Sequence, residues 1–148
     1  MIVLADTPVW SLALRRQSEQ LSPTERQLTD ALAELIREGR VRMLGPVRQE
    51  LLSGIREEAQ FVKLRNSLRA FDESPLEIED YEEAARMSNQ CRRRGIAGSA
   101  TDFLICAAAH RRGWAVFTSD RDFRNYAETV AVRLYSPAGT RGSPAREP

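Results

Sequence analysis

Histidine and lysine are almost absent from this 148-residue chain, which contains one of each, His110 and Lys63. A single histidine excludes acid–base mechanisms that need a pair of histidines. A Ser-His-Asp triad would depend on His110 alone, and the G-x-S-x-G turn that often carries the serine is missing. We expect His110 to lie near the end of a helix, where it complements the helix dipole.

Other missing motifs narrow the class of protein further. The chain has neither a G-x-x-x-x-G-K loop nor a G-x-G-x-x-G fingerprint, so the common nucleotide-binding folds are not indicated. Its two cysteines, Cys91 and Cys106, form no C-x-x-C motif, and neither a disulfide framework nor a zinc site is expected. No signal peptide is recognised at the N-terminus, and no segment approaches the ~20 apolar residues of a membrane span. Two free thiols suit a reducing compartment, so we expect a cytoplasmic protein.

Net charge and length bear on the partners of the protein and on the number of its domains. Lys and Arg total 22 and Asp and Glu total 21, so net charge gives no sign of nucleic-acid binding, and any basic surface must be local. The length suits one domain, which we place at residues 1–135. Residues 136–148 are dominated by Pro, Gly, Ser and Arg, and we expect a disordered tail there.

Four short apolar segments have the composition of buried strands: residues 2–5, 41–44, 114–118 and 130–134. Helical patterns lie between them, and the clearest helix start combines Ser22 with Glu25 in a capping box. Asp80 is expected to cap the helix that contains Tyr81. Strands that alternate with helices predict an α/β fold. We expect a three-layer α/β/α domain, in which helices surround a short, mostly parallel central sheet.

Acidic residues stand where these elements end or begin. Asp6 follows the first strand, Glu50 lies in the helix after the second, and Asp102 opens a buried helix. Asp120 and Asp122 follow the third strand. Strand ends and helix starts converge on one edge of an α/β sheet, so acids from distant segments meet there. Such a pocket commonly holds a divalent cation through oxygen ligands.

Taken singly, each acid also has an ordinary structural interpretation. Asp6 and Asp102 can cap helices, Glu50 can lie on a solvated face, and aspartates are common in turns. However, an aspartate directly after a buried strand is costly unless it is solvated, paired or metal-bound. Ser99 is also available to cap the helix that Asp102 opens. The four contexts together favour a shared site.

The ordered set resembles the PIN-domain ribonucleases, and specifically the VapC-type toxins of toxin–antitoxin pairs. The resemblance is carried by ADTPVW at residues 5–10, VRQELLSG at residues 47–54, Asp102 before an alanine-rich helix, and TSDRDF at residues 118–123. It extends over residues 1 to about 135. One departure is Pro8, where serine is commoner in the family.

The resemblance implies a metal-dependent endoribonuclease that hydrolyses RNA phosphodiester bonds with Mg²⁺ or Mn²⁺. It also implies that the protein is the toxin of a toxin–antitoxin pair, forms a homodimer and is inhibited by a cognate antitoxin. The implied catalytic and metal-binding residues are Asp6, Glu50, Asp102 and Asp120, with Asp122, Thr7 and Thr118 as auxiliary candidates.

Two alternatives stay open on the same fold. One is a catalytically silent interaction module, and the other is an RNA-processing nuclease outside a toxin–antitoxin pair. Leu12, Leu14, Leu28 and Leu35 of the early helices are candidates for partner contacts, with packing in the core of the domain as the simpler alternative. Arg48 and Arg121 are candidates for contacts with RNA phosphates, with ordinary surface charge as the simpler interpretation of each.

Overall fold

The computed structural model describes residues 1–15 and 18–137. Residues 138–148 of the predicted tail lie outside the described residues, and the domain boundary near residue 135 stays a prediction. Four parallel strands form one sheet in the order β2-β1-β3-β4. They are β1 (Val3–Ala5), β2 (Val41–Arg42), β3 (Ala115–Phe117) and β4 (Arg133–Leu134). All four strands fall within the segments predicted from the sequence.

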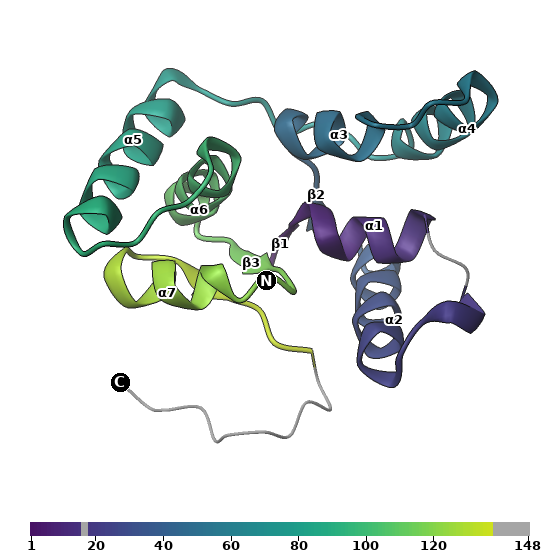
Figure 1. Ribbon diagram of the computed structural model, residues 1–148, viewed down its shortest axis with the longest axis horizontal. Coiled ribbons are helices and arrows are strands. Elements are labelled where there is room, and N and C mark those ends of the chain that lie inside the picture. The colour runs from purple at the N-terminus through teal and green to yellow at the C-terminus, as the bar shows by residue number, and fades with distance from the viewer. Residues whose placement is uncertain (16–17, 138–148) are drawn as a thin grey trace.

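The strand order places helices on both faces of the sheet. From β1 the chain steps to β2 on one side, and it later returns past β1 to β3 and continues to β4. Since parallel crossovers are right-handed, steps in opposite directions put their helices on opposite faces. Figure 1 shows α1 and α2 on one side and α5, α6 and α7 on the other. The predicted three-layer α/β/α fold is confirmed.

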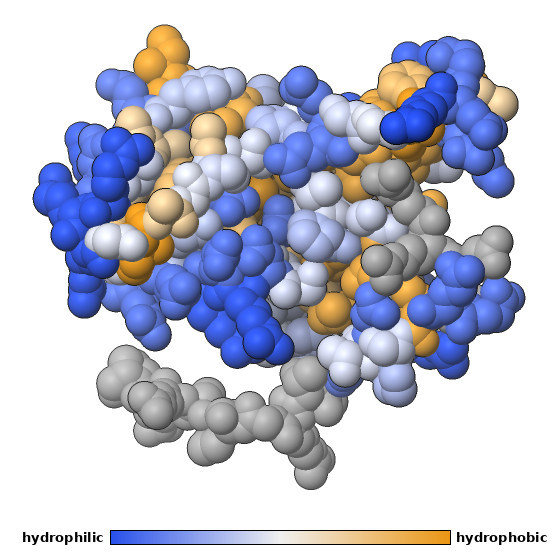
Figure 2. Space-filling model, viewed as in Figure 1, coloured by the Kyte–Doolittle hydropathy of each residue, from blue (hydrophilic) through white to orange (hydrophobic). Residues whose placement is uncertain are grey.

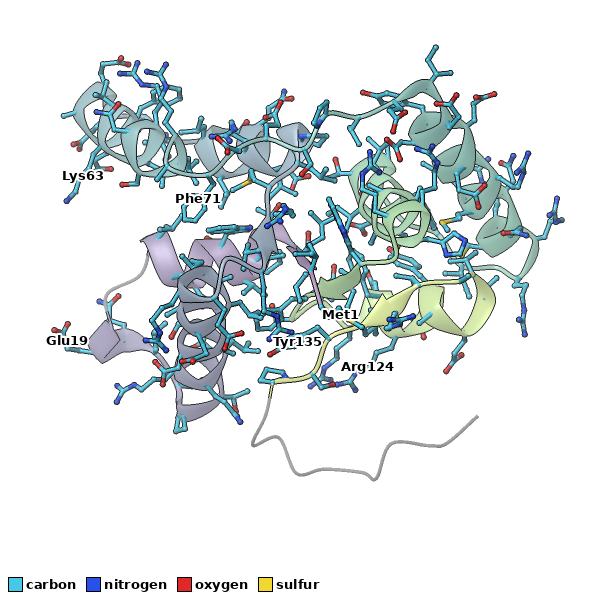
Figure 3. All side chains as sticks on the ribbon, turned by 180° about the vertical axis from the view of Figure 1, so that it is seen from behind. Met1, Glu19, Lys63, Phe71, Arg124 and Tyr135 are labelled. Atoms are coloured by element: carbon cyan, nitrogen blue, oxygen red, sulfur yellow. The ribbon has the colours of Figure 1, made fainter. Side chains whose placement is uncertain are left out.

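The helices of the two layers have the following bounds: α1 (Thr7–Arg15), α2 (Pro23–Arg37), α5 (Ile78–Arg93), α6 (Ala100–Arg112) and α7 (Asp122–Thr129), with a 3-10 turn at Ser18–Gln20. Helices α3 (Gly45–Leu52) and α4 (Glu58–Leu68) form an arm beside α1. Phe71, which follows the arm, packs edge-on against Trp10 of α1 with ring centroids 4.8 Å apart (Figure 3). This contact fixes the arm to the domain.

The centre of the sheet is fully buried. Val3, Leu4 and Ala5 of β1 are each 0% exposed, because helical layers cover both faces. This explains why the strand reads as a continuous apolar run without alternation. Cys91 and Cys106 are buried free thiols, as expected. Within the described residues, no helix is long and apolar enough to cross a membrane.

The four early leucines belong to the core. Leu12 and Leu35 are buried, and Leu14 and Leu28 pack partly buried against the same cluster. Their apolar faces are therefore used within the fold.

Arg48 is also occupied within the fold. Its guanidinium donates hydrogen bonds to a carboxylate oxygen of Glu73 (3.2 Å) and to the backbone carbonyls of Leu68 (3.0 Å) and Phe71 (2.9 Å). Arg48 thus joins α3 to the segment that follows α4, and surface charge is not its role.

Local capping signals identified one helix start correctly and another incorrectly. Ser22 and Glu25 form the predicted capping box, with hydrogen bonds of 3.1 and 3.0 Å. Asp80 was expected to cap its helix. Instead α5 begins at Ile78 with Glu77 as N-cap, and Asp80 lies inside the first turn, where it accepts a hydrogen bond from the Glu77 amide (2.7 Å).

Asp80 is a buried anion that joins two helices. It is 0% exposed, and it accepts hydrogen bonds from Arg111 (2.7 Å) and from two nitrogens of Arg112 (2.7 and 2.8 Å). The Arg112 guanidinium is the main reason that the pKa of Asp80 lies well below its usual range, although burial acts in the opposite direction. The start of α5 is thereby held to the end of α6.

Asp80→Asn should destabilise the fold by roughly 3 kcal/mol, because removing one partner of a buried ion pair leaves the other uncompensated. Since the folded-state pKa is depressed, the wild-type stabilisation is present at neutral pH and is lost as pH falls below about 4. Urea unfolding at pH 7 measures the difference. The exposed Asp72→Asn variant is the control, and equal stability of the two variants would contradict the role of Asp80.

Candidate metal centre

The candidate site lies where the chain reverses direction across the sheet. Strands β1 and β3 are neighbours, and the helices that follow them lie on opposite faces. In open α/β sheets ligands bind outside the carboxyl ends of such strands, and we refer to this edge of the sheet as the crevice. Ala5 pairs with Phe117, and the Asp6 amide donates to the Phe117 carbonyl (2.8 Å). This register brings Asp6 and Thr118 together although 112 positions separate them.

Asp6 is the buried carboxylate at this crevice. It is 4% exposed, and its two oxygens accept hydrogen bonds from the Thr7 amide (2.8 Å) and the Thr118 hydroxyl (2.9 Å). Burial raises its pKa to about 6, and the charges of Asp102 and Glu50 add to the rise, while the two hydrogen bonds oppose it. Each carboxylate oxygen can accept a further contact, so both remain available to a cation.

Glu50 reaches the same crevice from α3. This side chain is exposed, and one of its oxygens accepts a hydrogen bond from the Thr7 hydroxyl (2.7 Å). Thr7 therefore contacts two acids, Asp6 through its amide and Glu50 through its hydroxyl.

Asp102 enters from α6. The carboxyl end of this helix leads into β3, so its first turn lies at the opposite edge of the sheet, beside Asp6. Ser99 caps the helix by accepting from the Asp102 amide (3.1 Å), which leaves the Asp102 carboxylate free of the capping role. Its Oδ2 accepts from the Tyr126 hydroxyl (2.8 Å). Burial raises the pKa of Asp102, and the charges of Asp120 and Glu50 contribute.

Asp120 and Asp122 occupy different positions in the last loop. The Asp120 amide donates to the Thr118 hydroxyl oxygen (3.0 Å), and its Oδ1 accepts from the Asp122 amide (2.9 Å) at the start of α7. Asp120 is half-buried and its charge acts on Asp102, whereas Asp122 is exposed as the first residue of α7. The geometry favours Asp120 as the fourth member of the cluster.

The donor chemistry of the cluster suits a hard cation. No ion pair within residues 1–15 and 18–137 joins an arginine or lysine to any of these four acids, and the contacts that hold them come from amides and hydroxyls. Their negative charges therefore act on one another without neutralisation. Oxygen donors of this kind are the ligands of Mg²⁺ and Mn²⁺.

The acidic side chains of the cluster do not stand close enough together to bind one ion directly as a group of three. Among residues 1–15 and 18–137, no three His, Cys, Asp or Glu side chains stand close enough to hold one ion together. Mg²⁺ usually keeps several waters and takes only one or two carboxylates directly. The open arrangement therefore fits an ion held partly through water.

Two residues of the site were not identified from the sequence. Tyr126 contacts Asp102 from a separate helix, and Gly98 lies against the Tyr126 hydroxyl. Neither contact follows a local pattern. One sequence signal was the glycine directly before the Ser99 cap. A glycine at such a position indicates that another group lies close to the backbone, but it does not identify that group.

The chain belongs to the PIN domain family, whose model matches residues 3–129. Its fold is that of FitAcB from Neisseria gonorrhoeae (TM-score 0.71, 22% identity, covering 92% of this chain and 98% of that chain). VapBC2 from Rickettsia felis, solved with a DNA fragment from its promoter, has a similar fold (TM-score 0.71, 16% identity, covering 91% of this chain and 98% of that chain). VapBC-5 from Mycobacterium tuberculosis is also similar (TM-score 0.59, 20% identity, covering 91% of this chain and 97% of that chain). No curated protein sequence matches the chain significantly.

Asp6 should make the metal-free protein less stable as the pH rises. Its pKa is about 6 in the folded state against an ordinary value of 3.8, so the folded state binds the proton more tightly. Stability is therefore lost between about pH 4 and pH 6, by roughly 3 kcal/mol. Asp6→Asn lacks this loss and should be more stable than the wild type at pH 8, measured by urea unfolding with EDTA. A less stable variant at pH 8 would show that the Asp6 charge is not penalised.

Proposed function

We propose that this PIN-domain protein is the toxin of a toxin–antitoxin pair and acts as a Mg²⁺- or Mn²⁺-dependent endoribonuclease. One observation carries the proposal: Asp6, Glu50, Asp102 and Asp120 come from four separate segments of the chain, and their charges act on one another at the carboxyl edge of the sheet. A family fold with a decayed site would have no reason to keep a buried acid there.

Each residue has a role in this proposal. Asp6 and Asp102 would hold the cation, and Asp120 and Glu50 would complete its acidic surroundings. The cation would supply polarisation of the scissile phosphate and activation of the attacking water. Thr118 orients Asp6, and Thr7 contacts both Asp6 and Glu50. Such outer contacts fix ligand orientation.

Exposed arginines at the same edge support RNA as the substrate. The connection from α5 to α6 lies at this edge, because it leads into the first turn of α6, and α7 begins here directly after β3. Arg92 and Arg93 end α5, and Arg121 precedes α7; all three are exposed and form no ion pair within the described residues. Figure 2 shows hydrophilic side chains gathered over these elements. Arginine binds phosphate oxygens well.

The antitoxin and the homodimer are inferred from the fold. VapBC-5 is described as a member of the VapBC family of toxin–antitoxin systems, and VapBC2 carries the same family name. We propose that a cognate antitoxin inhibits this protein by covering its acidic crevice, that the protein forms a homodimer, and that it acts on RNA in the cytoplasm.

A catalytically silent interaction module is the alternative from a different class. It has no need of a cation, so Mn²⁺ titration by calorimetry separates the two. An RNA-processing nuclease would also bind Mn²⁺. Mapping new RNA ends after brief expression in cells, with and without the antitoxin, separates an RNA-processing nuclease from a toxin, because only the toxin's cleavage should be suppressed by the antitoxin.

Asp6→Asn should reduce RNA cleavage in the presence of Mg²⁺ or Mn²⁺ by about 100-fold or more, because the buried ligand is lost. Cleavage of a labelled RNA pool measures the rate, and circular dichroism checks that the variant folds. Asp72→Asn, an exposed acid far along the chain from the cluster, should cleave like the wild type. Wild-type cleavage by Asp6→Asn would overturn the metal assignment.

Asp120→Asn should weaken Mn²⁺ binding about tenfold or more, whereas Asp122→Asn should change it little. The backbone amide of Asp122, which donates to Oδ1 of Asp120, is present in both variants. The comparison therefore tests the two carboxylate side chains. Calorimetric dissociation constants give the result. A larger effect at Asp122 would make Asp122 the fourth member of the cluster.

A further inference from the structure

Tyr126 donates a hydrogen bond to the Asp102 carboxylate from a second helix. It lies on α7, is 0% exposed, and its hydroxyl stands 2.8 Å from Oδ2 of Asp102. Its ring packs between Phe103 and Phe123, with centroid distances of 5.0 and 5.1 Å. The ring therefore has little freedom, and the hydroxyl is held at one place relative to Asp102.

Gly98 makes room for this hydroxyl. A Cβ atom at position 98 would lie 2.5 Å from the Tyr126 hydroxyl oxygen, 2.8 Å from the ring carbon that carries it and 2.9 Å from a ring carbon of Phe103. Gly98 is not among the glycines with positive φ, so the position needs the absence of a side chain and not an unusual backbone. The backbone at Gly98 is thus one wall of the Tyr126 hydroxyl site.

The contact constrains how Asp102 can bind a cation. A phenol is protonated at neutral pH and donates one hydrogen bond. Because Tyr126 donates to Oδ2, that oxygen is held toward α7, while the Ser99 side chain also acts on the carboxylate. Without the Tyr126 hydroxyl, the carboxylate would lose its contact with α7 and would be less restricted in its orientation.

We propose that Tyr126 is a positioning residue, which fixes the orientation of the Asp102 carboxylate that would hold the cation, and that Gly98 is required for this contact. The inference rests on the proposed function, since it assigns Asp102 to the cation. A purely structural role would need only the ring, because the aromatic packing against Phe103 and Phe123 is the same for phenylalanine. The hydroxyl is therefore the part to test.

Tyr126→Phe should raise the Mn²⁺ dissociation constant about 10- to 100-fold, the usual effect of losing a partner that orients a metal ligand. Calorimetry measures the constant, and thermal unfolding checks the fold. Cleavage by the variant should recover toward the wild-type rate as Mn²⁺ is raised, with KM for RNA unchanged. Tyr81→Phe, at an exposed tyrosine of α5, is the matched control and should leave Mn²⁺ affinity unchanged.

The outcomes separate this inference from the proposed function. If wild-type protein binds no Mn²⁺, the proposed function fails. If the wild type binds Mn²⁺ and Tyr126→Phe binds it equally tightly, the proposed function stands and the positioning role of Tyr126 is overturned. A fall in cleavage that saturating Mn²⁺ does not recover would also overturn it, because the defect would then lie outside metal binding.

Gly98→Ala provides a second test through the same contact. The added methyl group displaces the Tyr126 hydroxyl, so Mn²⁺ affinity should fall in the same direction as for Tyr126→Phe. In the double variant the two losses should be less than additive, because each removes the same hydrogen bond. Full additivity would show that Gly98 acts on the site by another route and would overturn its part of the inference.

Discussion

The candidate site depends on the pairing of β1 with β3. Parallel pairing aligns Ala5 with Phe117, so both strands end at the same height and the next residues meet. The Asp6 amide continues the ladder by bonding to the Phe117 carbonyl, and the side chains of Asp6 and Thr118 are then within hydrogen-bond distance. Two of the other acids are placed relative to this pair: Glu50 through Thr7, and Asp120 through Thr118. Asp102 is held separately, by the start of α6 and by Tyr126 of α7.

Neutral donors hold the acids in place, and this determines the electrostatics of the crevice. Amides and hydroxyls orient carboxylates without cancelling their charge, so Asp6 and Asp102 keep raised pKa values, caused first by burial and then by neighbouring acids. Asp80 shows the contrast within the same chain. It is buried like Asp6, but two arginines neutralise it and its pKa is lowered. An acid paired with arginine stabilises the fold, whereas a buried acid without a cationic partner costs free energy, and a bound cation can offset this cost.

The sequence predicted features that depend on neighbours along the chain. The apolar strands, the Ser22 capping box and the acids at element ends follow from local patterns and from the geometry of parallel sheets. Asp80 was misplaced by the same local reasoning, because aspartate is a common cap and the arginines that bury it lie 31 and 32 positions away. The Tyr126 contact with Asp102 spans 24 positions and two helices, so no periodicity encodes it.

Pro8 illustrates how the local sequence at Asp6 tolerates a departure from the family pattern. A proline lacks an amide donor, and it stands in the first turn of α1, where amides have no partner within the helix. The contacts that matter are supplied by its neighbours. The Asp6 carboxylate is held by the Thr7 amide, and the Asp6 carbonyl accepts from the Val9 and Trp10 amides (3.1 and 3.3 Å), which starts the helix. Since Thr7 also supplies the hydroxyl that holds Glu50, the residue before the proline carries both polar contacts. The acidic crevice therefore needs threonine at position 7 and only a helix-compatible residue at position 8.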